Sequence, residues 1–186
     1  SDHFIKKILT KFGINSLTFK VGQTTEEIIE LVKASGYADQ LAMVYIETPA
    51  NPTNDLIDIA GAKAVASHFS TANKEVYLAV DNTYMGPVWQ HPLQHGADLV
   101  LYSATKYIGG HSDVIAGACL GSKALIGRVK VLRTFLGNMA SPNTGWLLLR
   151  SLETLKIRMD MQALNANQVA NFLNHHPMVE KVYFIG

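Results

Sequence analysis

Three short polar segments hold the side chains of this sequence that are best suited to chemistry. The segments are Glu47-Thr48-Pro49-Ala50-Asn51-Pro52-Thr53, Asp81-Asn82-Thr83-Tyr84 and Ser103-Ala104-Thr105-Lys106, and each directly follows an apolar run. Together they supply carboxylates, hydroxyls, amides and one amine. If the apolar runs are neighbouring parallel strands, their carboxyl ends meet at one edge of a sheet, which is where α/β proteins bind ligands.

An amine, a carboxylate and hydroxyl donors in one place are what pyridoxal phosphate requires of a protein. Its aldehyde forms an imine with an amine, a carboxylate keeps its ring nitrogen protonated, and its phosphate accepts hydrogen bonds. Lys106 is the candidate amine and Asp81 is the candidate carboxylate. Taken alone, an aspartate at a strand end is often a turn residue and a lysine is mostly a solvated surface group. Their coincidence at successive strand ends favours the cofactor site.

The elements that must position these residues follow from the spacing of apolar residues. Continuous apolar runs, which are typical of strands buried on both faces, predict strands over 41–46, 76–80 and 98–102, and a weaker one over 116–120. Helices are predicted from the capping box at Thr24 to Gly36, over 58–71, from Ser141 through Leu155, and from Ala163 to Leu173, and the tail 179–184 alternates like a strand. This order predicts an α/β protein with a mostly parallel sheet flanked by helices.

The segment around Lys106 resembles the pyridoxal-phosphate attachment motif of the Cys/Met metabolism enzymes. That family includes cystathionine γ-lyase, methionine γ-lyase, cystathionine γ-synthase and O-acetylhomoserine sulfhydrylase. The similar segment runs from Asp98 to Asp113, and the other two polar segments are similar to the family's in order and spacing. The resemblance covers nearly the whole chain and implies the large domain of a fold-type I pyridoxal-phosphate-dependent transferase.

Carried over by position, the resemblance implies a role for each matching residue. Lys106 would form the imine with the cofactor and would then move protons at the α carbon of the substrate. Asp81 would pair with the ring nitrogen, and Ser103 and Thr105 would bind the phosphate. Asn51 would lie near the phenolic oxygen of the cofactor or the carboxylate of the substrate.

The resemblance also implies a lyase of trans-sulfuration in cysteine and methionine metabolism. We expect it to cleave a carbon–sulfur bond by γ-elimination from cystathionine or methionine. The alternatives are γ-replacement, by a cystathionine γ-synthase or an O-acetylhomoserine sulfhydrylase, and an inactive fragment of such an enzyme. Family members are longer, so the chain is expected to be incomplete. Residues 1–160 would form most of the large domain, and residues 161–186 a linker helix and the start of the carboxyl-terminal small domain.

Composition narrows the partners that the protein can have. Sixteen basic and 15 acidic residues give a net charge of +1, without the basic stripe that nucleic-acid binding requires. No apolar run reaches the length of a membrane span. The single cysteine, Cys119, is expected in the core and suits a cytoplasmic location.

No metal site is expected, because Pro92 lies between His91 and His95 and no third ligand is near. A small sulfur amino acid is the expected partner, and the resemblance adds a homodimer or homotetramer with the site at a subunit interface.

Overall fold

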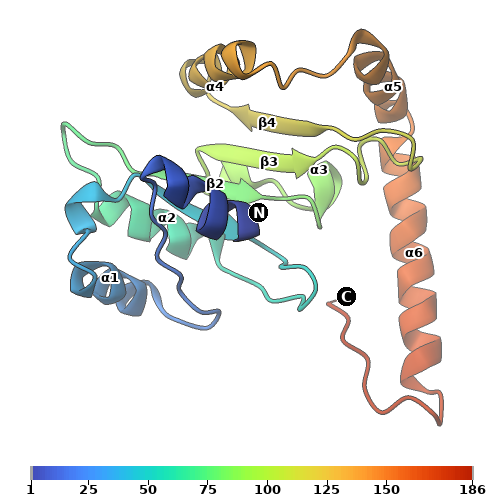
Figure 1. Cartoon of the computed structure of the whole chain (residues 1–186). Coiled ribbons are helices and arrows are strands. Elements are labelled where there is room, and N and C mark those ends of the chain that lie inside the picture. The colour runs from blue at the N-terminus through green and yellow to red at the C-terminus, as the bar shows by residue number, and fades with distance from the viewer. Residues whose placement is uncertain (1, 186) are drawn as a thin grey trace.

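A four-stranded sheet lies at the centre of the computed structural model, which describes residues 2–185 (Figure 1). Its strands are β1 (Met43–Glu47), β2 (Tyr77–Asp81), β3 (Leu99–Ser103) and β4 (Gly117–Gly121), in that order across the sheet. β1, β2 and β3 are parallel, and β4 pairs antiparallel with β3. The predicted mostly parallel α/β sheet is therefore confirmed, and each of its predicted strands forms.

Two helices pack beside β1 and β2. α1 (Thr25–Ala34) begins at the predicted capping box, in which Thr24 Oγ1 accepts a hydrogen bond from Glu27 N and the Glu27 carboxylate accepts one from Thr24 N. α2 (Ile59–His68) begins at Asp58, whose carboxylate accepts hydrogen bonds from two backbone amides of the first turn. α2 contacts both strands, and α1 packs against α2.

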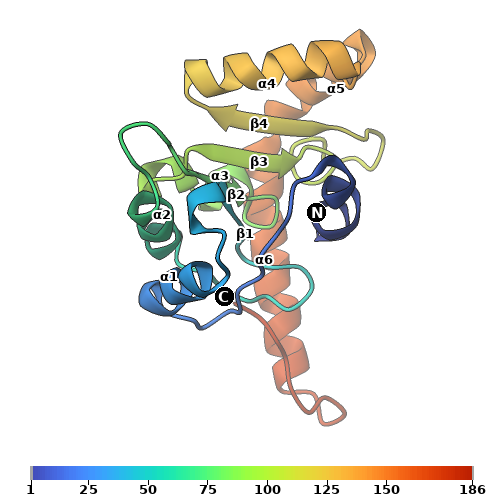
Figure 2. The ribbon, with the colours of Figure 1, turned by 60° about the vertical axis from the view of Figure 1, so that its left-hand side comes forward.

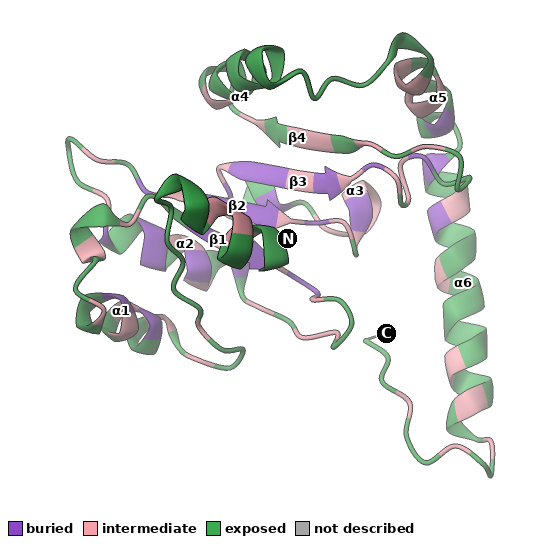
Figure 3. Cartoon of the chain, in the orientation of Figure 1, coloured by how far each residue is buried: buried purple, intermediate pink, exposed green. Residues whose placement is uncertain are grey.

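The apolar core lies between α2 and the parallel strands, and Figure 3 shows buried residues on α2, β2 and β3. Among its best-buried members are Ile46, Val65, Leu78 and Val80. Burial of apolar surface is the main favourable contribution to folding. This core therefore holds β1, β2 and β3, and with them the ends of the strands, in fixed positions.

The remaining helices follow β2 and β4, and the long α6 extends well beyond the sheet (Figure 2). Their bounds are α3 (Gly86–Trp89), α4 (Lys123–Leu136), α5 (Pro142–Leu152) and α6 (Leu155–Asn174), and short π or 3₁₀ turns occupy η1 (Phe4–Ile8), η2 (Leu9–Phe12), η3 (Ala38–Gln40) and η4 (Pro92–His95). No helix within residues 2–185 combines the length and the apolar character needed to cross a membrane.

The division between the last two helices differs from the prediction. Apolar spacing predicts one helix through Leu155 and a separate helix from Ala163, whereas α5 ends at Leu152 and α6 begins at Leu155. The chain turns at Glu153 and Thr154, and the buried side chain of Leu155 belongs to the first turn of α6. The periodicity of a helix continues across such a turn, so spacing alone does not reveal the break.

The prediction of a strand at 179–184 is wrong. These residues have no regular structure, and none of the strands in the described chain pairs with them. The tail is joined to the loop after β1 by a hydrogen bond from Asn54 Nδ2 to Tyr183 O, at 3.2 Å. A strand needs a partner to complete its hydrogen bonds. The predicted domain boundary at 160/161 falls inside the continuous helix α6, and it stays a prediction.

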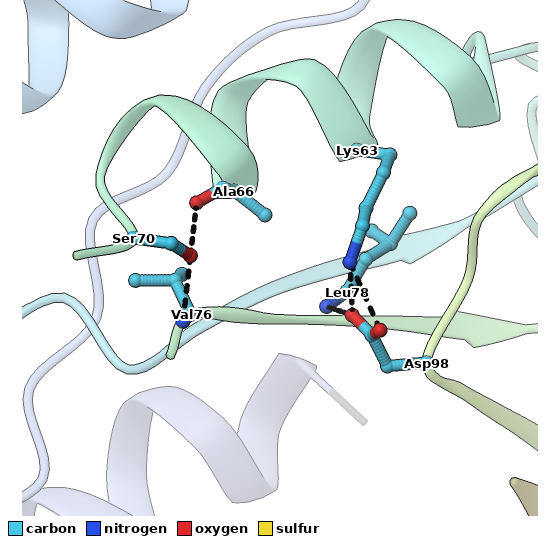
Figure 4. Close-up of polar contacts among 6 residues, drawn as sticks. All are labelled: Lys63, Ala66, Ser70, Val76, Leu78 and Asp98. Atoms are coloured by element: carbon cyan, nitrogen blue, oxygen red, sulfur yellow. Dashed lines mark hydrogen bonds and ion pairs between the residues drawn. The ribbon is translucent and has the colours of Figure 1, made fainter. Parts of the chain in front are cut away.

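Side-chain hydrogen bonds close the amino edge of the sheet, by which we mean the start of β2 and the start of β3 (Figure 4). Asp98 accepts from Lys63 Nζ at 2.8 and 2.9 Å, and it also accepts from Leu78 N at 2.7 Å. Nearby, Ser70 Oγ donates to Ala66 O and accepts from Val76 N, both at 3.0 Å. These contacts tie α2 and the chain that follows it to β2 and β3.

Candidate active site

The opposite, carboxyl edge of the sheet opens into a cavity. Because β1, β2 and β3 are parallel, their carboxyl ends lie together, and the register places Glu47 beside Asp81. A cavity of about 850 Å³ lies at this edge. Its walls are formed by Glu47, Asn51, Thr83, Tyr84, Thr105, Lys106, Tyr107, Gly110, Ser112, Asp113, Val114, Ile115 and Gln162. This volume is typical of sites for small ligands.

Lys106 lies in the tight turn that follows β3. Its backbone N–H donates to Ser103 O at 3.0 Å, and its carbonyl accepts from Gly110 N at 2.7 Å. The side chain is exposed and lines the cavity. No residue of the described part of the chain forms a hydrogen bond or an ion pair with Nζ of Lys106. The amine is therefore accessible from the cavity, as an imine-forming lysine must be.

Asp81 lies at the end of β2 and is half-buried. Its Oδ2 accepts from Tyr45 Oη at 3.3 Å, and its Oδ1 accepts from Thr83 N at 3.1 Å. The hydroxyl of Thr83 in turn accepts from Ser103 N at 2.7 Å, which joins the ends of β2 and β3. Asp81 and Ser103 are not among the residues that line the cavity, but Thr83, which contacts both of them, is.

Asn82 fixes the loop between Asp81 and α3. It is fully buried, and its Nδ2 donates to Gly86 O at 3.0 Å and Gln90 O at 2.9 Å, while its Oδ1 accepts from Gln90 Nε2 at 2.8 Å. A buried amide whose donors and acceptor are all used specifies one conformation of its surroundings. The position of Asp81 is therefore set on one side by the strand and on the other by this loop.

Two further predicted residues, Thr105 and Asn51, line the cavity. Thr105 Oγ1 donates to Ala116 O at 3.3 Å and accepts from Ala116 N at 3.0 Å, so its hydroxyl joins the turn of Lys106 to the segment before β4. Asn51 is exposed, and its backbone N–H donates to Glu47 Oε1 at 3.4 Å. The structure thus brings Lys106, Thr105 and Asn51 onto one cavity, with Asp81 and Ser103 at the adjoining strand ends.

Part of the wall was not predicted from the sequence. Tyr107 packs edge-on against Trp89, with ring centroids 5.5 Å apart, and burial together with nearby Tyr84 raises the pKa of its phenol. The phenol is therefore neutral near neutral pH and can donate a hydrogen bond. The loop 110–115 and Gln162 complete the wall. Gln162 comes from α6, far along the chain, and no local pattern connects it to Lys106.

The chemistry of these donors fits pyridoxal phosphate. An accessible amine faces a cavity of suitable size, a carboxylate lies at the adjoining strand end, and hydroxyl and amide groups surround them. A metal does not have the same support. Within residues 2–185, no group of three or more His, Cys, Asp or Glu side chains is placed to hold a metal ion.

Comparisons with known proteins agree with this chemistry. The model of a family described as Cys/Met metabolism PLP-dependent enzyme matches residues 1–186. The chain is 40% identical to an L-methionine gamma-lyase from Treponema denticola over 98% of this chain and 44% of that protein. It is 37% identical to the cystathionine gamma-lyase of Homo sapiens over 100% of this chain and 44% of that protein.

A solved structure has the same fold. The cystathionine gamma-lyase from Lactobacillus plantarum, complexed with L-serine, is similar with a TM-score of 0.84 and 33% identity, over 98% of this chain and 45% of that one. The chain therefore spans less than half the length of the relatives that it matches.

Proposed function

Because this chain belongs to the Cys/Met metabolism family of PLP-dependent enzymes, we propose that it carries the cofactor site of a carbon–sulfur lyase acting on a sulfur amino acid. The observation that carries this proposal is the amine of Lys106, which lies on the cavity at the carboxyl edge and has no partner among residues 2–185. The reaction proposed is γ-elimination from methionine or cystathionine. It is supported by similarity to proteins named L-methionine gamma-lyase and cystathionine gamma-lyase.

Lys106 would hold the cofactor and handle the proton of the substrate. When bound, pyridoxal phosphate supplies an aldehyde that takes up an amine and a ring that withdraws electrons from the carbon beside it. The free amine of Lys106 would act as the base that removes the proton from the α carbon of the substrate. The turn fixes the backbone of Lys106 beside the cavity, so that its flexible side chain would reach both the cofactor and the substrate.

Asp81 would balance the positive charge of the protonated ring nitrogen. Its carboxylate is held by Tyr45 and Thr83, and a carboxylate with fixed partners needs little rearrangement to receive a cation. Ser103 and Thr105 would donate to the phosphate, for which the Thr105 hydroxyl must turn away from Ala116. Asn51 would contact the cofactor's phenolic oxygen or the substrate carboxylate, since it lies on the same cavity.

The balanced reaction gives the experiment. Elimination from methionine consumes water and yields methanethiol, ammonia and 2-oxobutyrate. The protein should be incubated separately with methionine, with cystathionine, and with O-acetylhomoserine plus sulfide. Formation of 2-oxobutyrate from methionine or cystathionine supports a lyase. A new thiol or thioether formed from O-acetylhomoserine, with no 2-oxobutyrate, would contradict it and assign γ-replacement.

Cofactor attachment is tested separately from turnover. The protein with added pyridoxal phosphate should be yellow, and borohydride should remove the colour and fix the cofactor covalently. Lys106→Ala should prevent both. Lys156→Ala is the matched control, because Lys156 is an exposed lysine of α6 that pairs with Asp160 and does not line the cavity. If the parent protein, which keeps Lys106, stays colourless with added pyridoxal phosphate, the chain does not bind the cofactor.

The proposal includes a second copy of the chain as a partner. Large apolar side chains of α4 are exposed, among them Leu132 (62%), Phe135 (84%) and Leu136 (74%), and Ile115 on the cavity wall is 94% exposed. Exposed apolar patches of this kind mark interfaces. We expect a homodimer or homotetramer with the cavity near the interface, and Phe135→Glu should reduce the mass measured by sedimentation. A monomeric parent protein would contradict this.

The proposed location of the protein is the cytoplasm, which its single cysteine supports.

A further inference from the structure

Arg158 of α6 joins the turn of Lys106 to the end of α5. Its Nη1 donates to Tyr107 O at 2.8 Å, and its Nη2 donates to Ser151 O at 2.8 Å and lies 3.5 Å from Ile108 O. Its Nε donates to Thr154 Oγ1 at 3.1 Å. Within the described residues no carboxylate pairs with this guanidinium. All three nitrogens of the guanidinium therefore donate to neutral oxygens, and two of these oxygens belong to the residues directly after Lys106.

Gly110 provides the space that the guanidinium occupies. Its φ is +74°, and a Cβ at this position would lie 2.6 Å from Arg158 Cζ and in closer collision with Nη1. Any larger residue would be strained and would also displace Arg158. The same glycine donates its N–H to Lys106 O at 2.7 Å. Gly110 thus forms the hydrogen bond that closes the turn of Lys106, and it also leaves the space in which the Arg158 guanidinium lies.

The neighbour of Arg158 contacts the other strand-end loop. Met159 is fully buried, and its Cε lies 2.7 Å from the place where a Cβ of Gly86 would be. Gly86 accepts the hydrogen bond from Asn82 in the loop that follows Asp81. One turn further along α6, Gln162 lines the cavity. The first turns of α6 therefore contact the segments that carry both Lys106 and Asp81.

We propose that Arg158 is a positioning residue that holds the turn of Lys106 so that the lysine amine faces the cavity. This inference deepens the proposed function and rests on Lys106 being the cofactor lysine. The planar, charged guanidinium can reach carbonyls on two sides at once, which a lysine ammonium cannot do. The position of the Lys106 amine consequently depends on how α6 packs against the turn.

The first test needs no cofactor and measures amide hydrogen exchange in the turn. Arg158→Lys keeps the charge and the stem, Arg158→Met removes the donors, and Lys156→Met removes a charge from the same helix without touching the turn. We expect exchange in residues 104–111 to rise about tenfold or more in both Arg158 variants, since hydrogen bonds from charged donors contribute on this scale. Exchange in β2 should not change, and Lys156→Met should match the parent.

The second test uses the protein loaded with pyridoxal phosphate. The visible absorption band of the bound cofactor is followed as a function of pH, because it reports whether the nitrogen that joins Lys106 to the cofactor is protonated. We expect Arg158→Lys and Arg158→Met to shift the midpoint of this titration and to weaken cofactor binding, with no shift in Lys156→Met. A loss of activity alone is not the readout, since many structural changes produce it.

Each result bears on the proposal. Parent-like exchange in 104–111, or an unshifted titration, in Arg158→Lys would overturn the positioning role. An equal rise of exchange in 104–111 and in β2, or an unfolded Arg158→Lys protein, would show general structural support and would also overturn it. Failure of borohydride to label Lys106 in the parent would refute the proposed function, while the exchange result would still decide whether Arg158 holds the turn.

Discussion

The two edges of the parallel sheet each hold a lysine and an aspartate, and they differ in what these side chains contact. At the amino edge, Lys63 and Asp98 pair with each other, and Asp98 also accepts from Leu78 N (Figure 4). At the carboxyl edge, Lys106 has no partner within the described residues, and Asp81 contacts neutral donors. The same residue types are thus structural where they satisfy each other and available for chemistry where they do not.

The difference has a physical cause in the topology. Parallel strands bring their polar ends together at both edges, but α2, which packs against β1 and β2, supplies Lys63 as a partner for Asp98 at the amino edge. At the carboxyl edge the loops diverge and leave a cavity between them. An exposed side chain without partners adds little to the stability of the fold. Substitutions at the two edges should therefore have opposite effects on activity and on stability.

The largest expected effect comes from Lys106→Ala. We expect activity to fall about 10⁴-fold or more, because the residue that we propose to form the bond to the cofactor is lost. The free energy of unfolding of the cofactor-free protein should change by no more than about 0.5 kcal/mol, as for an exposed side chain without partners. Urea unfolding and the 2-oxobutyrate assay measure the two quantities. A marked loss of stability would mean that Lys106 has a structural partner.

Asp81→Asn should have the next largest effect on activity. The change keeps the shape of the side chain and removes its charge, so the protonated ring nitrogen would lose the counter-charge that we propose Asp81 to supply. We expect a loss of about 10²-fold in turnover, the scale found when one group that stabilises developing charge is removed. Asp81→Glu restores the charge and should recover part of the loss. Equal turnover in the parent and in Asp81→Asn would show that Asp81 does not act on the ring nitrogen of the cofactor.

Asp98→Asn, at the amino edge, should lower the stability of the protein and leave the cofactor site unchanged. The amide keeps one acceptor for Leu78 N but loses the ion pair with Lys63, whose side chain is 31% exposed while that of Asp98 is 19% exposed. We expect the free energy of unfolding to fall by about 1–2 kcal/mol, the scale of hydrogen bonds to charged groups after solvent screening. Lys106 labelling should be unchanged. A loss of labelling without a loss of stability would contradict the division between the edges.

The smallest expected effect concerns Cys119 on β4, away from both edges. Burial raises the pKa of its thiol, so the reactive thiolate is scarcer near neutral pH than in a free cysteine. Alkylation should therefore be several-fold slower than for a model thiol, and it should speed up as the pH rises through the raised pKa. Mass spectrometry of the alkylated protein measures the rate. Alkylation as fast as that of a free thiol would show that β4 is not protected.

Local patterns were enough to predict much of the fold. The four strands and the capping box at Thr24 follow from apolar runs and from one hydrogen-bonding motif, both of which act over a few residues. The polar ends of the strands indicated the edge where the cavity lies. Roles at the site remain predictions for Lys106, Asp81, Ser103, Thr105 and Asn51.

The features that sequence reasoning missed depend on contacts between distant parts of the chain. Arg158 reaches the Lys106 turn, and Gln162 reaches the cavity, from a helix about fifty positions later in the chain. The side chain of an arginine on a helix carries no sign of which carbonyls it will meet. Cys119 was expected in the core, but β4 lies at the border of the sheet and leaves it half-buried. The strand predicted at 179–184 failed for the same reason, since pairing is not a local property.

The most direct test of the account compares the two lysines in one experiment. The protein is incubated with pyridoxal phosphate, reduced with borohydride, digested, and analysed by mass spectrometry for the modified lysine. We predict stoichiometric modification of Lys106 at low cofactor concentration and none of Lys63, which stays paired with Asp98. Modification of Lys63 or of exposed lysines at the same level as Lys106 would contradict the central claim that the carboxyl edge holds the cofactor lysine.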